Sequence, residues 1–113
     1  MPFTINEKKA YEATPDAVFQ AVLGAVEGLQ GKVEKQDGAA RTVEARFDKT
    51  IHGKVLGDRT RMHVQVNGGD GHSELDVEIY PIDPVGRKLQ FGARKGVARQ
   101  VITWFFAHVE HRL

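Results

Sequence analysis

The 113-residue chain contains no cysteine and only one serine, and both absences restrict its chemistry. Without cysteine it can form no disulfide, no thiol nucleophile and no cysteine-ligated metal centre. The only serine, Ser73, lies in a glycine-rich segment without the signature of a nucleophile turn. The carboxylates of Asp76 and Glu78 alternate along a predicted strand, where charge usually serves solubility. We therefore expect that the protein is not an enzyme.

The chain also lacks a long hydrophobic run. Its longest mostly apolar stretch, residues 101–109, is too short to cross a bilayer. Residues 1–9 carry charges where a signal peptide needs an apolar stretch. These features predict a cytoplasmic protein without a membrane partner. A hydrophobic content of 41% and a charged content of 27% are typical of a folded domain, and the length predicts one domain over residues 1–113.

Acidic residues are absent between Asp83 and Glu110, although the whole chain has a net charge of only +1. Residues 1–83 carry a net charge of −4 and residues 84–113 a net charge of +5. Such asymmetry is found on anion-binding and nucleic-acid-binding surfaces. It is equally consistent with a basic element packed beside an acidic sheet, which we regard as the simpler interpretation.

The first half of the sequence predicts a strand and then a helix. Phe3, Ile5 and Tyr11 share one parity, whereas Glu7 and Lys9 interrupt it, so this strand should bulge or lie at a sheet edge. Thr14-Pro15-Asp16 combines a capping residue, a first-turn proline and a dipole-compatible acid, which predicts a helix start. Gly31 is placed to end that helix in a left-handed conformation. Ala17, Ala21, Gly24 and Gly28 form a small-residue stripe that would let a neighbouring backbone approach closely.

Four further strands and a second helix complete the predicted fold. Alternating apolar and polar residues predict strands near residues 33–37, 42–48, 61–66 and 75–80, with an irregular connection over residues 49–58. Residues 97–113 predict an amphipathic helix whose apolar arc spans about 200°, wider than the roughly 100° stripe that covers one sheet face. The fold class is α+β: about five antiparallel strands with two helices on one face, in the order β-α-β-β-β-β-α, with room for an extra short strand near residues 87–91.

Three segments carry a resemblance to known proteins. Tyr11 to Phe19, Leu56-Gly57-Asp58 and Phe91-Gly92-Ala93-Arg94-Lys95 resemble the junctions of small bacterial α+β domains of unknown function. The segment from Ala13 to Phe19 and the long C-terminal helix are also similar to START and Bet v 1 ligand binders of the helix-grip type. The first resemblance implies a fold without an activity. The second implies ligand binding, although the shorter chain predicts no large enclosed cavity.

The wide apolar arc of the last helix is the most unusual feature, and it supports two hypotheses. The first is a binding or interaction module that self-associates or contacts another protein, with Trp104 and Phe106 at the interface. In this case Trp104→Ala should weaken self-association. The second is a carrier of a small apolar ligand held between sheet and helices. Its lining would comprise Phe19, Val64, Val77, Phe105 and Val109.

The basic segment supports a third hypothesis, and the histidines support none. Free amides before the last helix could bind phosphate or nucleic acid together with nearby cations, although interleaved exposed aromatics are too few to favour nucleic acid. These cations are Arg87, Lys88, Arg94, Lys95 and Arg99. His108 and His111 could share a helix face, but Glu110 points away from both, so we expect no metal and no cofactor.

Overall fold

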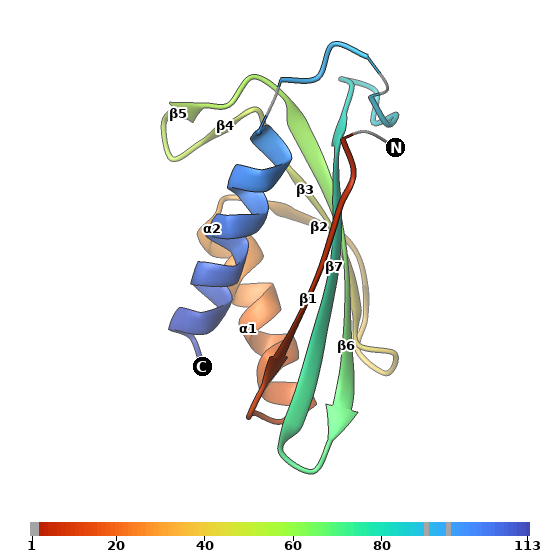
Figure 1. Ribbon diagram of the computed structural model, residues 1–113, viewed down its shortest axis with the longest axis vertical. Helices are drawn as coiled ribbons and strands as arrows, with labels where there is room; N and C mark the ends of the chain where they lie inside the picture. Colours follow the sequence, from red (N-terminus) through yellow and green to blue (C-terminus); the bar gives the residue numbers. More distant parts are fainter. Residues whose placement is uncertain (1–2, 90, 95) are drawn as a thin grey trace.

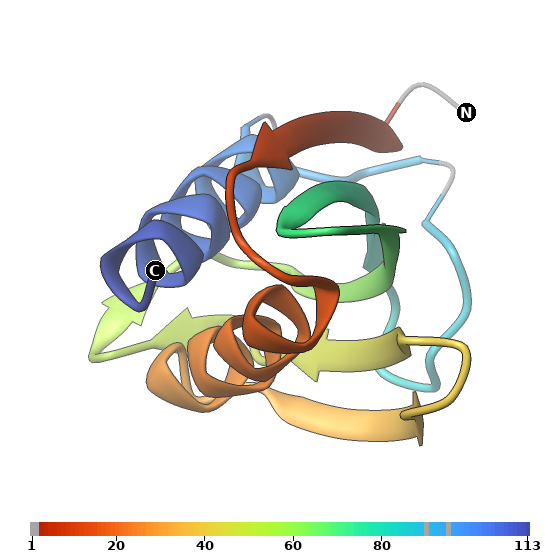
Figure 2. The same ribbon diagram turned by 90° about the horizontal axis from the view of Figure 1, so that it is seen from below.

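A five-stranded antiparallel sheet carries two helices on one of its faces. The computed structural model describes residues 3–89, 91–94 and 96–113. The sheet has the strand order β1-β7-β6-β3-β2, and Figures 1 and 2 show both helices on the same side of it. The strands are β1 (Ile5–Tyr11), β2 (Lys32–Asp37), β3 (Thr42–Phe47), β6 (Arg59–Gly69) and β7 (His72–Ile82), and the helices are α1 (Pro15–Gly28) and α2 (Val97–His111). The predicted fold class and element order are confirmed.

Period-two alternation decides which sheet face is buried. In β6, Met62, Val64 and Val66 are buried, whereas the intervening Arg61 and His63 lie on the face without helices. The antiparallel register places Glu44 of β3 and Glu78 of β7 on either side of His63. Because all neighbouring strands are antiparallel, the sequence needs no crossover helix between them. The helix-free face is therefore polar, and we call it the outer face.

Helix α1 begins as predicted but ends differently. The Thr14 hydroxyl accepts a hydrogen bond from the Ala17 amide at 3.1 Å, and Pro15 occupies the first turn. The left-handed residue at the other end is Gln30, at φ 61°, not Gly31 as the sequence predicted. Gly31 is required for a different reason: a Cβ there would lie 2.5 Å from Cε1 of Phe47. Close packing against the sheet thus explains this glycine.

Side chains, not a neighbouring backbone, occupy the space beside the small-residue stripe of α1. A Cβ at Gly24 would lie 2.6 Å from Nε of Arg112, and one at Gly28 would lie 2.9 Å from Nδ1 of His108. Both neighbours belong to the C-terminal end of α2 and the residue after it. The two glycines of the stripe therefore accommodate side chains from the C-terminal end of α2, whereas Ala17 is exposed.

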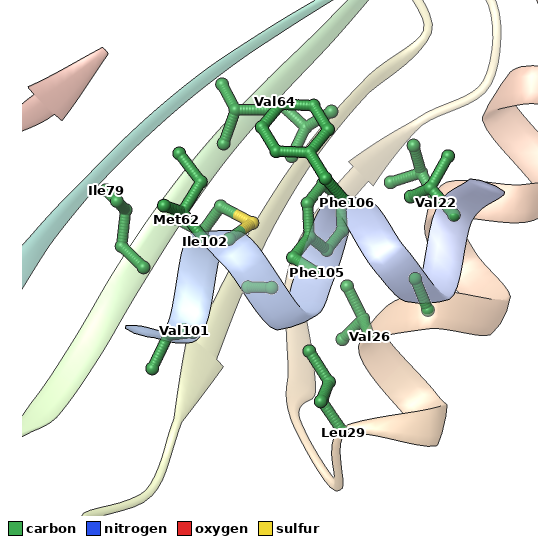
Figure 3. Packing of buried hydrophobic residues seen from close by; sticks show 14 of the residues in the cluster. Val22, Val26, Leu29, Met62, Val64, Ile79, Val101, Ile102, Phe105 and Phe106 are labelled. Atoms are coloured by element: carbon green, nitrogen blue, oxygen red, sulfur yellow. The ribbon is translucent and has the colours of Figure 1, made fainter. Parts of the chain in front are cut away.

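The wide apolar arc of α2 is used almost entirely within this one chain. Its apolar side chains pack between the sheet and α1, as Figure 3 shows for Val101, Ile102, Phe105 and Phe106. Phe105 is fully buried and Phe106 is 2% exposed. Their rings meet edge to face with centroids 5.8 Å apart. The helix contacts both the sheet and α1, so it buries more than one apolar stripe, whereas Arg99, Thr103 and Glu110 on its other side are exposed. Neither helix in the described residues is long and apolar enough to span a membrane.

Three local features depart from or refine the sequence prediction. The connection over residues 49–58 contains a small hairpin, β4 (Thr50–Ile51) with β5 (Lys54–Val55), which folds toward α2. Of the predicted extra strand near residues 87–91, the described residues form a single bridge between Ile82 and Lys88. Strand β1 lies at a sheet edge as expected.

Candidate ligand-binding cleft at the start of helix α2

The first turn of α2 has neither a side-chain cap nor an acidic side chain. Gly96 caps the helix at φ 86°, a left-handed conformation that glycine adopts without steric cost. No side chain hydrogen-bonds to the cap, and the first turn contains no acid. The positive end of the helix dipole is therefore left for an external anion or water.

A cleft of about 390 Å³ lies beside this helix start. Its apolar walls come from Phe3 and Ile5 at the start of the edge strand, Pro81 at the end of β7, and Ala98 of α2. Its charged lining comes from the guanidinium-bearing residues Arg94 and Arg99. The cleft thus places two cations and a helix N-terminus above an apolar floor, which is an arrangement for an amphipathic anion.

Both arginines have defined positions. Arg99 Nη1 donates a hydrogen bond to Glu7 Oε1 on β1. The backbone amide of Arg94 donates to Asp58 Oδ2 at 2.5 Å, and its side chain lies directly against Gly57. Gly57 has φ 103° and cannot gain a side chain without displacing Arg94. Neighbouring loops therefore fix the arginine at the mouth of the cleft.

A second set of contacts holds α2 to strand β1 beyond the cleft. The Tyr11 hydroxyl donates to Glu110 Oε2 at 2.7 Å, and Lys9 Nζ lies 3.3 Å from the same oxygen. The hydrogen bond from Tyr11 lowers the pKa of Glu110, while burial raises the pKa of Tyr11. Glu7 and Lys9, which interrupt the apolar parity of the first strand, thus face α2 and pair with it.

Of the described basic residues predicted to act together, only two line the cleft. Arg94 and Arg99 reach the cleft, but Lys88 Nζ lies 4.4 Å from the centre of the Tyr80 ring, and the Arg87 amide is held by Asp83. Lys95 lies outside the described residues. The sequence did not predict the apolar lining of the cleft. Its only signal was that Phe3 and Ile5 share the parity of the first strand that was expected to be buried.

The apolar residues predicted to bind a ligand or partner are separated in the same way. Phe19, Phe105 and Phe106 belong to the packed core. Trp104 is half-buried beside a separate opening of about 240 Å³, and Lys54 Nζ lies 5.6 Å from its ring centre. Because the wide apolar arc of α2 is buried in the core, it no longer argues for an interface with another protein. Self-association stays a prediction.

A larger opening on the other side of the sheet is a less suitable ligand site. It measures about 560 Å³ and lies on the outer face, around Glu44, His63 and Glu78. His63 is held there by the Tyr80 hydroxyl at 2.9 Å and faces Glu44 at 3.9 Å. Small-molecule sites are mostly apolar with a few polar groups, whereas this groove is lined largely by charged and polar side chains.

Within the described residues, no group of three or more potential ligands could hold a metal ion.

The fold of this chain is similar to the folds of several solved structures. The chain is similar to Ara h 8.0201, with 13% identity, coverage of 96% of both chains and a TM-score of 0.60. It is also similar to the di-domain ARO/CYC protein StfQ from the steffimycin biosynthetic pathway, with 11% identity, 93% coverage of this chain, 43% of that chain and a TM-score of 0.65. XoxI from Bacillus cereus matches with 8% identity, coverage of 96% and 94%, and a TM-score of 0.60.

These neighbours show that the protein has the helix-grip fold of Bet v 1-like and START-like proteins. No protein-family model matches the chain. No curated protein sequence matches it either. At 8–13% identity the likeness shows the fold alone. The resemblance to the helix-grip type noted in the sequence is confirmed at that level.

Proposed function

We propose that the protein is a non-catalytic binding module for a small amphipathic anion, held in the cleft at the start of α2. The observation that carries the proposal is the pairing of an apolar floor with Arg94, Arg99 and an uncapped helix N-terminus in one 390 Å³ space. A volume at the lower end of the usual range for ligand pockets suits a molecule such as a medium-chain carboxylic acid.

Two further observations support binding without catalysis. The described residues that line the cleft include no histidine, carboxylate or hydroxyl group to serve as base or nucleophile. The only serine, Ser73, is fully buried, and its hydroxyl donates to the Ala13 carbonyl at 2.6 Å. Ser73 therefore has a structural role at the start of β7.

The interior between sheet and helices is a weaker candidate for the ligand. The five residues predicted to line an internal cavity are buried in the core cluster, and four of them line none of the openings described: Phe19, Val77, Phe105 and Val109. We therefore place the proposed ligand in the cleft at the start of α2 rather than between the sheet and the helices. At this position the carrier hypothesis and the anion-binding hypothesis for the basic segment become one proposal.

The proposal is tested with decanoate and its neutral analogue decanol, each displacing the fluorescent probe anilinonaphthalene sulfonate. We expect decanoate to bind more tightly than decanol, because only the carboxylate gains from the cations. Arg99→Gln should weaken decanoate binding about three- to tenfold, as expected for a partly exposed charge contact. Glu7→Gln should strengthen decanoate binding, because it frees Arg99 from its present partner.

Arg87→Gln is the matched control, because Arg87 is an exposed cation of the same connector that does not line the cleft. Ala98→Leu should weaken decanoate and decanol alike by filling the apolar floor. Equal affinity for decanoate and decanol, or an equal loss in Arg87→Gln and Arg99→Gln, would refute the proposed site.

A further inference from the structure

The most exposed large hydrophobic side chains gather at one end of the molecule. Phe91 is 86% exposed, Val85 75% and Val55 74%. Val55 belongs to the hairpin β4–β5, and the other two belong to the connector between β7 and α2. Figure 1 shows hairpin and connector together at one end of the long axis, opposite the β6–β7 turn. We call the described residues of 48–59 and 83–94 the loop end.

Direct contacts join the two segments of the loop end into one surface. The Arg94 amide binds Asp58, and the Arg94 side chain covers Gly57. Lys49 and Asp83 line the same 330 Å³ opening from opposite segments. The exposed apolar side chains therefore project from a shared, positioned base.

This end is also positively charged. Its described residues include six cations and three carboxylates, for a net charge of +3. Each carboxylate is engaged locally: Asp58 with the Arg94 amide, Asp83 with the amides of Val85 and Arg87, and Asp48 with Arg59 at 3.8 Å. The cations are Lys49, Lys54, Arg59, Arg87, Lys88 and Arg94.

We propose that the loop end docks the protein on an anionic phospholipid bilayer, with Phe91 and Val85 entering the headgroup region and the surrounding cations facing lipid phosphates. Reversible docking takes an apolar contact together with a basic patch, and both are present here. This proposal departs from the sequence-based expectation of no membrane partner, which was argued from the lack of a spanning segment; docking of this kind needs no such segment.

The shape of the end favours a bilayer over a protein partner. The molecule is elongated, measuring 44 × 27 × 21 Å, and the loop end is one of its two narrow ends. The apolar side chains also project from separate loops rather than forming one flat patch. Separate apolar tips can each enter a fluid headgroup layer, whereas a rigid partner would need a matching pocket for each.

The test is co-sedimentation with vesicles of phosphatidylcholine, with and without phosphatidylserine, at low and high salt. We expect binding only to vesicles that contain phosphatidylserine, and less binding at high salt. Phe91→Ser should weaken binding about tenfold, as for loss of a partly buried aromatic side chain. Arg87→Gln and Lys88→Gln should each weaken it about fivefold. Leu113→Ser and Lys35→Gln alter similar exposed groups away from the loop end and should bind like the unchanged protein.

Two results would overturn the proposal. One is equal binding to both kinds of vesicle, and the other is unchanged binding by Phe91→Ser. If vesicles do not bind and sedimentation velocity instead shows self-association that Phe91→Ser abolishes, the loop end is a protein interface. Decanoate affinity, measured without vesicles, reports on the cleft alone, so failure of one proposal is distinguishable from failure of the other.

Discussion

Removing the phenyl ring of Phe105 should create a cavity in the packed interior between the sheet and the helices. Phe105 is fully buried between α2 and the sheet and contacts the Phe106 ring edge to face. A buried Phe→Ala change costs about 3–5 kcal/mol from lost burial and the cavity left behind. A domain of this size has about 5–15 kcal/mol of stability in total, so Phe105→Ala should remain folded but be strongly destabilised.

The lost ring leaves an apolar, benzene-shaped space, which should stay dry and accept benzene. Benzene at about ten times its dissociation constant would restore about 1.4 kcal/mol. Urea unfolding at 25 °C, with and without benzene, measures both effects. The unchanged protein should gain nothing from benzene, because its interior is packed.

Phe91→Ala is the matched control for this experiment. It removes the same ring from a site that is 86% exposed, so the free energy of unfolding should change by less than about 0.5 kcal/mol. If Phe105→Ala costs no more than Phe91→Ala, or if the unchanged protein is itself stabilised by benzene, the interior is not filled as described.

Two further predictions concern packing and pH. Gly31→Ala should destabilise the fold by about 1–2 kcal/mol, because its Cβ would clash with Phe47, whereas Gly38→Ala, with nothing within 4 Å, should be neutral or slightly stabilising. Urea unfolding of both variants checks this, and an equal effect would contradict the packing argument. Burial and the nearby charge of Arg112 lower the pKa of His108 below 6.5. The unfolded chain therefore binds the proton more readily, and the free energy of unfolding should fall as the pH drops below about 6.5. NMR titration would give the pKa directly, and the loss should shrink in His108→Gln.

Local patterns in the sequence were sufficient for the elements and their order. Alternation in strands such as residues 61–66 and 75–80 identified the buried face, because side chains of a strand alternate between two sides. Thr14-Pro15-Asp16 located the start of α1 through its own hydrogen-bonding geometry. The charges at Glu7 and Lys9 correctly indicated an edge strand. These features depend on neighbours within a few residues, so the sequence by itself determined them.

The cleft depends on residues that are distant in sequence. Phe3, Pro81 and Ala98 meet only because β1 pairs with β7 and α2 returns along the same edge. The same return buries Phe106, which local periodicity alone could equally have placed at an interface. The role of Gly31 was likewise decided by the approach of Phe47. Periodicity states that a face is apolar, but only the tertiary structure decides what covers that face, because burial is a property of the neighbours that the chain brings together.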